Sequence, residues 1–473
     1  MAPQGELPAR GGGPKLHRNR GIVNSVRAQT LVSCVYGELR GYRRLAIRRT
    51  VAANERLSRE ALRDASDVAF RQCVRNAIAR FPYYADRVRA HRGSLPGAAE
   101  HVRSEELPVW TRRDQREFFS KQERPPDAAY IHQTGGSTGL PIRFHVTRES
   151  YEWRTAVTDR AYGWARAEEG RRSVYVWADL ATATYAKHLK RRLQRALQRR
   201  TYFHALQQFT DAERLACCQL IDRVKPDALV GYSGRLVDIA RYVRDHPGVL
   251  SWKSPTLVCA AEGLHPSQRP LLEEHLAGDV YLSYGSREFM SVGMECEHHQ
   301  GYHINSDNVL VEVVDKSGAP LPPGTEGRIV ITDLHNPATP FIRYEIGDIG
   351  IVAPDEPCPC GRPFPLLKSV EGRTQDVVYT PEGIVSGLYV TWAMWQFDSW
   401  IEGYQVVQRT KDRVDIRLLT TAPLTPERLA PVTALLRKEL GNTIQIEYER
   451  ASELERGRTG KIALVVSSVE EER

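Results

Sequence analysis

The sequence predicts an α/β protein, and two observations carry that prediction. Between about residue 130 and residue 350, short apolar runs alternate with helical patterns, and the runs are SVYVWA (173–178), DALVGY (227–232), TLVCAAEG (256–263) and DVYLSYGS (279–286). This alternation is typical of a largely parallel sheet covered by helices. The second observation is length, because 473 residues can bury several hydrophobic cores and predict two or three domains.

The first 130 residues are expected to be mostly helical after a short tail. Residues 1–25 are rich in Gly, Pro and Arg and read as a flexible basic tail. Residues 22–90 carry apolar side chains at helical spacing, which predicts two or three helices. The segment LPVWTRRDQREFF (107–119) predicts another, with Thr111 as its N-cap and Asp114 completing a capping box. Further helices are expected between the strands, at 187–200, 211–224 and 266–276.

The pattern changes in the last third of the chain. Residues 302–372 are rich in β-formers and turns, and we expect them to form a small antiparallel β-barrel-like subdomain. Residues 373–473 read as a separate α+β domain, with strands near 404–410, 413–420 and 444–451 and a helix at 425–440. The sequence therefore predicts a large domain (26–372) and a small C-terminal domain (373–473). The helical spacing of Trp392, Trp395 and Trp400 favours core packing in the small domain.

Charge and composition exclude several classes of protein. The net charge is +8, and residues 1–50 hold ten Lys/Arg and two Asp/Glu, which accounts for the whole excess. No basic motif interleaved with aromatic residues appears, so nucleic acid is not an expected partner. No apolar run approaches the roughly 20 residues of a membrane span, and no secretory signal is apparent. The run 187–200 has seven Lys/Arg and reads as an amphipathic basic helix, either solvated or attracting an anionic substrate, coenzyme A phosphates or a membrane surface.

A glycine-rich segment gives the sharpest local signal for chemistry. QTGGSTGLP (133–141) concentrates Gly, Ser and Thr immediately before an expected strand. Backbone N–H groups of such a loop can converge on phosphate oxygens, and its hydroxyls add donors. The loop lacks the Lys that precedes Ser/Thr in the P-loop of nucleotide hydrolases. By itself, such a loop is more often a flexible turn.

Five further motifs follow this loop in a fixed order. They are CAAEG (259–263), YGSREF (284–289), RYEIGD (343–348), GRTQD (372–376) and GRTGK (457–461). With the loop, this order resembles the adenylate-forming ligase superfamily. FPYYADRV (81–88) and LPVWTRRDQREFF resemble the N-terminal signatures of its phenylacetate–CoA ligase branch. KPDALVGYSGRLVDIARY (225–242) is similar to the branch's capsule-biosynthesis-type members. The resemblance covers roughly residues 60–470.

The resemblance implies a role for each matched residue. The loop residues that would hold the β- and γ-phosphates of ATP are Thr134, Gly135, Gly136, Ser137, Thr138 and Gly139. Adenine would stack on Tyr284, beside Gly285, and be lined by Ala261, Glu262 and Gly263. Asp348 and Arg373 would contact ribose, and Glu288 would ligate Mg²⁺. Lys461 would stabilise charge in the adenylation step, with Thr134 and Glu288 as the other catalytic residues, and Asp376 would be the hinge of the small, mobile domain. The acid pocket would include Gly231, Tyr232, Ser233 and Ala260.

Three positions depart from the family pattern. Ile346 replaces the Thr before the ribose-binding Gly-Asp, Leu140 stands where related ligases often have Lys, and Gly136 replaces the second hydroxyl of the loop. Nucleotide binding is still expected. The motifs specify the reaction rate and the acid substrate less closely.

A second constellation is typical of a metal site. Cys358 and Cys360 form a C-x-C pair, and Cys296 with His303 could complete a tetrahedral Cys₃His zinc set. His298 and His299 compete for the fourth position, and His303 is preferred because GYHI matches the branch. Four protein ligands leave no open position, so we expect structural Zn²⁺. The alternative is a set of reduced thiols beside solvated histidines.

The motifs together predict an ATP-dependent ligase. We expect it to activate a carboxylic acid, with an aromatic acid favoured, as an acyl-adenylate with release of pyrophosphate, and to transfer the acyl group to coenzyme A. Transfer to an amine, or activation of another oxyanion without coenzyme A, is the alternative. A non-enzymatic scaffold that retains the ligase fold is the hypothesis from a different class. A cytoplasmic monomer or homodimer fits the cysteine usage and the absence of targeting signals.

Overall fold

The computed structural model describes most of the chain. The described residues are 43–97, 102–122, 124–134, 142–177, 195–196, 198–204, 210–264, 268–373, 377–381, 383–387, 390, 393–394, 396–397, 399–455 and 462–469. Several predictions therefore lie outside them: the tail 1–25, Gly135–Gly139 of the loop, most of the basic run 187–200, the hinge Asp376, Lys461, Trp392 and Trp395. None of the described helices is long and apolar enough to span a membrane.

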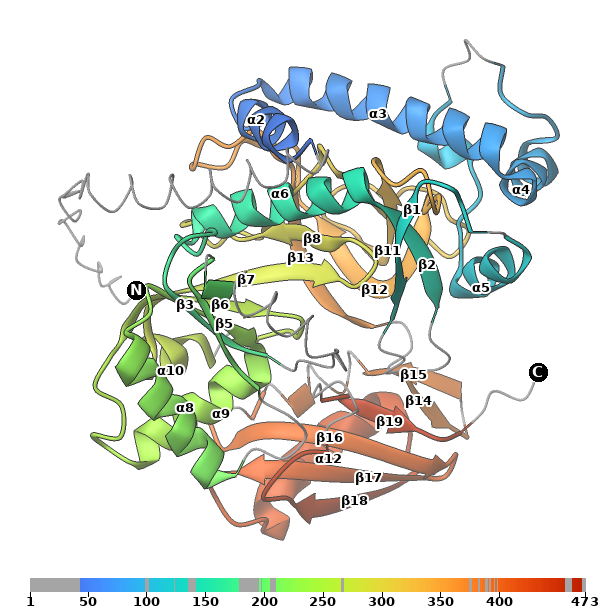
Figure 1. Cartoon of the computed structure of the whole chain (residues 1–473). Coiled ribbons are helices and arrows are strands. Elements are labelled where there is room, and N and C mark those ends of the chain that lie inside the picture. Colours follow the sequence, from blue (N-terminus) through green and yellow to red (C-terminus); the bar gives the residue numbers. More distant parts are fainter. Residues whose placement is uncertain are drawn as a thin grey trace, which may run out of the picture.

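A twisted eleven-stranded sheet organises the described part of the large domain (Figure 1). Its order is β10-β11-β12-β13-β9-β8-β7-β6-β5-β3-β4. The strands of the parallel half are β3 (Ser173–Val176), β4 (Arg200–Phe203), β5 (Ala228–Tyr232), β6 (Ser254–Ala260) and β7 (Ala277–Ser286). The strands of the antiparallel half are β8 (Met290–Met294), β9 (Tyr302–Ile304), β10 (Val309–Val314), β11 (Glu326–Asp333), β12 (Tyr344–Val352) and β13 (Leu366–Arg373).

The antiparallel strands expected for 302–372 are present, and their pairing continues into the parallel half of the sheet. β13 pairs with β9, β9 with β8, and β8 with β7, so backbone hydrogen bonds continue into the parallel half. The core explains this continuity, because Tyr284 of β7, Ile331 of β11 and Tyr344 of β12 share one hydrophobic cluster. Shared burial of this kind favours one continuous sheet.

Helices cover both faces of the sheet (Figure 1). Apolar faces of α8 (Asp211–Val224), α9 (Ser233–Asp245) and α10 (Gln268–His275) pack on the parallel strands. The opposite face is covered by α6 (Arg148–Trp164), above which lie α2 (Arg44–Asn54) and α3 (Arg59–Arg80). The helix α4 (Pro82–Arg92), the 3₁₀ turn Ser104–Glu106 and α5 (Arg112–Lys121) follow. The capping box predicted at Thr111 and Asp114 is confirmed. The helix expected over 187–200 overlaps β4 at Arg200.

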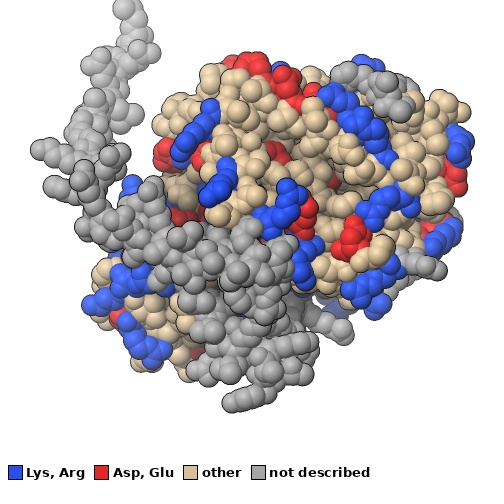
Figure 2. Space-filling view, turned by 45° about the horizontal axis from the view of Figure 1, so that its top comes forward, with Lys and Arg blue, Asp and Glu red and all other residues tan. Residues whose placement is uncertain are grey.

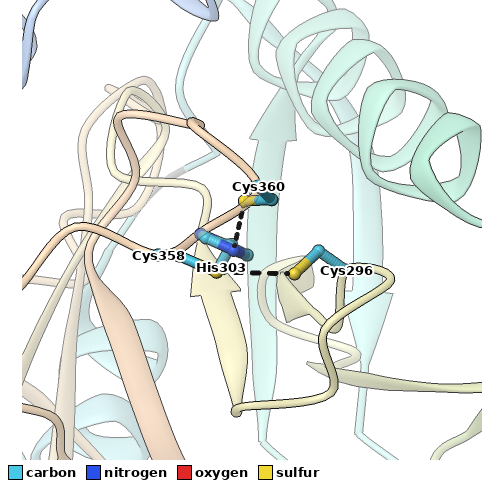
Figure 3. A group of neighbouring side chains, drawn as sticks. All are labelled: Cys296, His303, Cys358 and Cys360. Atoms are coloured by element: carbon cyan, nitrogen blue, oxygen red, sulfur yellow. Dashed lines mark hydrogen bonds between the residues drawn. The ribbon is translucent and has the colours of Figure 1, made fainter. Parts of the chain in front are cut away.

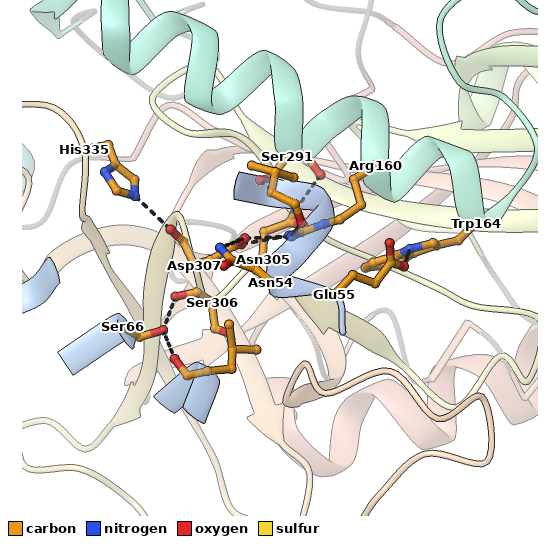
Figure 4. A network of polar contacts seen from close by, with 12 residues as sticks. Asn54, Glu55, Ser66, Arg160, Trp164, Ser291, Asn305, Ser306, Asp307 and His335 are labelled. Carbon is orange, nitrogen blue, oxygen red and sulfur yellow. Dashed lines mark hydrogen bonds and ion pairs between the residues drawn. The ribbon is translucent and has the colours of Figure 1, made fainter. Parts of the chain in front are cut away.

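Ion pairs fasten α2 and α6 to the sheet. Arg44 pairs with Glu152 of α6 at 2.6 Å, and Arg48 pairs with Asp159 at 2.7 Å. Arg160 of α6 contacts Asp307 and Asn305, and Asn54 also bonds Asp307 (Figure 4). Basic and acidic side chains are interspersed on the face shown in Figure 2. Part of the basic excess in residues 43–50 therefore serves internal packing of the fold.

The small domain lies against the large one beneath α9 (Figure 1). Its four-stranded sheet has the order β18-β17-β16-β19, and its elements are β16 (Ile401–Thr410), β17 (Arg413–Thr420), α12 (Pro426–Leu440), β18 (Gln445–Arg450) and β19 (Val465–Ser467). A hairpin of β14 (Val377–Thr380) and β15 (Gly383–Ser386) precedes it. Trp400 packs against this domain's core, as expected. Arg244 of α9 bonds Glu402 at 3.1 Å, which links the two domains.

Candidate active site and metal centre

Parallel strand register brings the predicted acid-pocket residues to one edge of the sheet. Tyr232 at the end of β5 lies opposite Ala260 of β6, and Ala260 lies opposite Ser283 of β7. Ligands of open α/β sheets bind outside the carboxyl ends of the strands, and these positions form such an edge. Gly231 fits closely, because an added Cβ would meet the Val176 carbonyl oxygen at 3.0 Å.

The turn after β6 is locked to the start of α9. Glu262 accepts a hydrogen bond from the Gly234 N–H at 2.9 Å, and its carbonyl oxygen accepts one from the Ser233 hydroxyl at 2.8 Å. Ala261, the residue before Glu262, has a φ of +67°, which is uncommon for a residue with a Cβ. The geometry therefore holds Ala261–Gly263 in a fixed, locally strained turn beside Ser233, as a preorganised binding edge would require.

The glycine-rich loop is framed by a short hairpin. Its strands are β1 (Ala128–Gln133) and β2 (Arg143–Thr147). The Thr134 N–H donates to the Ile142 carbonyl at 3.0 Å, and the Thr134 hydroxyl accepts from the Ile142 N–H at 3.0 Å. Thr134 is buried, and these two bonds fix its position immediately after β1.

The two predicted ligand carboxylates are both buried in the same part of the large domain. Glu288 follows β7 and is 3% exposed, and Asp348 of β12 is 8% exposed. The Tyr284 hydroxyl donates to Asp348 Oδ2 at 2.8 Å, and the Tyr344 hydroxyl donates to Glu288 Oε1 at 3.5 Å. Position 285, within β7, requires Gly, since a Cβ there would lie 2.1 Å from the Met290 carbonyl oxygen.

Three details of this site were not foreseen. Tyr344 lies in the RYEIGD motif, four residues before Asp348, which is the spacing that separates Tyr284 from Glu288. That repeated spacing is the signal that could have identified it. Ile346, the departure from the family's Thr, is buried in the core cluster with Tyr284. Asp348 is the β-partner of Arg373, so the backbones of the two predicted ribose contacts are adjacent.

An aromatic pair at the edge of the sheet was also missed. Trp177 follows β3 and stacks on Tyr232, with ring centroids 4.3 Å apart and an interplanar angle of 25°. The two rings follow neighbouring parallel strands, beside the predicted acid pocket. An apolar, planar wall of this kind suits a planar ligand group. The segment SVYVWA predicted the strand, but it did not show that Trp177 would stack on Tyr232.

The four predicted metal ligands converge, as Figure 3 shows. The ligand atoms of Cys296, His303, Cys358 and Cys360 all lie within 4.8 Å of one another. The Sγ atoms of Cys296 and Cys358 are 3.7 Å apart, and Cys360 Sγ is 3.3 Å from His303 Nε2. Zinc–sulfur bonds of about 2.3 Å in a tetrahedron place two sulfurs about 3.8 Å apart. The set therefore has the separations that a tetrahedral ion requires.

Electrostatics at the cluster agree with a metal-binding role. Burial lowers the pKa of His303 to about 4, so its imidazole is neutral, and His303 Nδ1 lies 3.1 Å from the Phe364 carbonyl oxygen, which leaves Nε2 for a ligand. Burial raises the pKa of Cys296 to about 12, so its thiolate needs a nearby cation. At Cys360 the effect of burial is outweighed by hydrogen bonds from Arg362, which lower the thiol pKa. His298 and His299 lie outside the cluster.

Sequence comparison finds both a family-model match and similar curated proteins. Residues 378–468 match the family model described as the CapK C-terminal domain. A phenylacetate–coenzyme A ligase of Aromatoleum evansii is 25% identical over 347 residues, which cover 68% of this chain and 73% of that protein. The chain is therefore similar to phenylacetate–CoA ligases over about two thirds of its length, and to the CapK C-terminal domain over residues 378–468. Protein CapK of Staphylococcus aureus is 24% identical over 60% of this chain and 62% of its own length.

Other matches to this chain cover a shorter stretch of it or show its fold alone. The phenylacetate–coenzyme A ligase of Thermus thermophilus is 32% identical over 173 residues, but that stretch covers 39% of the relative and 35% of this chain. A solved 2-hydroxyisobutyryl-CoA ligase in its postadenylation state has a TM-score of 0.68 at 19% identity, covering 87% of this chain and 90% of that one. The predicted α/β fold with a small C-terminal domain is thereby confirmed.

Proposed function

We propose that this protein activates a carboxylic acid with ATP and passes the acyl group to coenzyme A. The observation that carries the proposal is convergence. Segments far apart in sequence supply Tyr232, Ala260 and Tyr284 from the neighbouring strands β5, β6 and β7. Asp348 of β12 bonds Tyr284, and Glu288 lies just after β7. The relatives named phenylacetate–coenzyme A ligase support the same reaction class.

Each part of the site then has a chemical task. A carboxylate is a poor electrophile at neutral pH, and a mixed anhydride with AMP supplies a good leaving group. The loop from Thr134 to Gly139 binds the phosphates, and Asp348 with Arg373 orients the ribose. Lys461 stabilises the charge that develops as the acid attacks the α-phosphate. Bending at Asp376 lets the small domain present coenzyme A to the acyl-adenylate.

The carboxylate of Glu288 fits a divalent cation. Mg²⁺ prefers oxygen ligands and is usually held by one or two carboxylates together with substrate phosphates. Glu288 offers one buried carboxylate with Oε1 restrained by Tyr344. The ion supplies neutralisation of the pyrophosphate charge when it is bound.

We further propose that the Cys₃His cluster holds structural zinc and that the acid is aromatic. The sulfur and nitrogen separations support the zinc assignment. The Trp177–Tyr232 stack supports an aromatic acid, because offset-stacked rings offer a favourable surface to a third ring.

The two half-reactions test the proposal together. Lys461→Ala is expected to abolish acid-dependent pyrophosphate release while leaving thioester formation from preformed acyl-adenylate largely intact. Equal loss of both half-reactions contradicts the role assigned to Lys461. A wild-type protein that neither binds ATP in calorimetry nor releases pyrophosphate with any acid is the non-enzymatic scaffold.

A further inference from the structure

Two tyrosine–carboxylate contacts cross between neighbouring motifs. Tyr284, near the end of β7, bonds Asp348 of β12 at 2.8 Å. Tyr344, at the start of β12, bonds Glu288, just after β7, at 3.5 Å. Each motif therefore supplies the hydroxyl that contacts the other motif's carboxylate. In both motifs the tyrosine precedes the carboxylate by four residues.

All four residues of the two contacts are buried, so each carboxylate depends on its hydrogen-bond partners. Tyr284 and Asp348 are each 8% exposed, Glu288 is 3% exposed and Tyr344 is fully buried. A buried carboxylate is stable only with hydrogen-bond partners or a cation. Burial raises the pKa of Tyr344, and the charge of Glu288 raises it further, so this hydroxyl remains a donor at neutral pH.

The ring of Tyr344 has little freedom to move. It packs against Phe341 at 4.8 Å and Phe289 at 6.2 Å between ring centroids, within the largest described hydrophobic cluster. Tyr284 lies in the same cluster, 6.1 Å from the Tyr302 ring. Close packing keeps side chains in single rotamers, so each hydroxyl is delivered to a fixed point.

We propose that Tyr284 and Tyr344 are positioning residues, with Tyr284 orienting Asp348 for the ribose diol and Tyr344 orienting Glu288 for the magnesium ion. This inference rests on the proposed function and adds a division of labour to it. A carboxylate has two oxygens and about four acceptor sites, so Asp348 can accept from Tyr284 at Oδ2 and also contact ribose. The crossing ties the ribose site and the metal site to the same two strands.

The division of labour predicts separate defects. Tyr284→Phe is expected to reduce the preference for ATP over 2′-deoxyATP, measured as a kcat/KM ratio for pyrophosphate release, by about tenfold. Its half-saturating Mg²⁺ concentration stays at the wild-type value. Tyr344→Phe is expected to raise half-saturating Mg²⁺ about fivefold and to leave the ATP preference unchanged, because its contact is longer.

A third tyrosine provides the matched control. Tyr83→Phe removes a hydroxyl bonded to Glu117, a tyrosine–carboxylate contact outside the site. This variant is expected to match wild type in both readouts. Thermal unfolding of each variant checks the fold, and Tyr284→His and Tyr344→His, which keep a donor, are expected to recover part of each defect.

The outcomes separate the inference from the function on which it rests. Active wild type with wild-type ratios in both phenylalanine variants overturns the positioning roles alone. Equal changes of both readouts in both variants also overturn them, because a general structural defect would produce that result. Should a phenylalanine variant fail to fold, the histidine and alanine variants at the same position take its place. Wild-type ratios in both of them overturn the role. Wild type without ATP binding overturns the proposed function and this inference together.

Discussion

Replacement of single histidines near the Cys₃His cluster tests the metal centre at the level of individual ligands. His303→Ala removes one of the four proposed ligands, whereas His298→Ala and His299→Ala remove imidazoles that lie outside the cluster. Structural zinc contributes about 10 kcal/mol or more, so one of four ligands is worth about 2.5 kcal/mol. That energy corresponds to about 60-fold in zinc affinity.

Zinc content under competition with a chelator is the assay for these variants. Wild type, His298→Ala and His299→Ala are expected to retain about one zinc per chain, and His303→Ala is expected to fall below about 0.3 at the same chelator concentration. Cys296→Ala should behave like His303→Ala, because its Sγ is 3.7 Å from that of Cys358. Wild-type zinc content in His303→Ala, or loss of zinc in His298→Ala, refutes the ligand assignment.

Three further predictions concern stability and domain contact. Arg154→Met should destabilise the fold by about 3–5 kcal/mol in urea unfolding, because it leaves the fully buried Asp333 without its partner, while removing both charges should recover most of the loss. Burial lowers the pKa of His132 to about 4, below the roughly 6.5 of the unfolded chain. The unfolded state then binds more protons between these values, so stability should fall as pH drops from about 6.5 to 4, and His132→Gln should flatten that slope; parallel slopes would contradict this. Glu402→Gln weakens its contact with Arg244, worth about 0.5–1 kcal/mol, and should raise hydrogen exchange at the start of β16 several-fold; unchanged exchange would argue against the contact in solution.

Local patterns predicted the secondary structure because they depend on nearby residues. The helix expected over 211–224 has those bounds in α8, and the capping residues Thr111 and Asp114 bond as predicted. The continuity of the antiparallel strands with the parallel half was not predicted, because the pairing of β13 with β9 depends on long-range contacts that no short pattern encodes.

The candidate site shows the same division between local and distant information. The ordered motifs identified Glu288 and Asp348, and the C-x-C pair led to Cys296 and His303, which the structure brings together. The sequence did not reveal that Tyr284 bonds Asp348, because a partner 64 residues away is set by the register of the sheet. Nor did it show that Arg44 pairs with Glu152 of α6, which gives part of the basic N-terminal excess an internal role.

Acid-dependent pyrophosphate release, with and without coenzyme A, tests the central claim most directly. The purified full chain would be given ATP, Mg²⁺ and a panel of aromatic and aliphatic acids, and the acyl product identified by mass. We expect release with an aromatic acid and a thioester only when coenzyme A is present. Release without any thioester would contradict coenzyme A as the acceptor. Absence of release with every acid, together with absence of ATP binding, would contradict the assignment as a ligase.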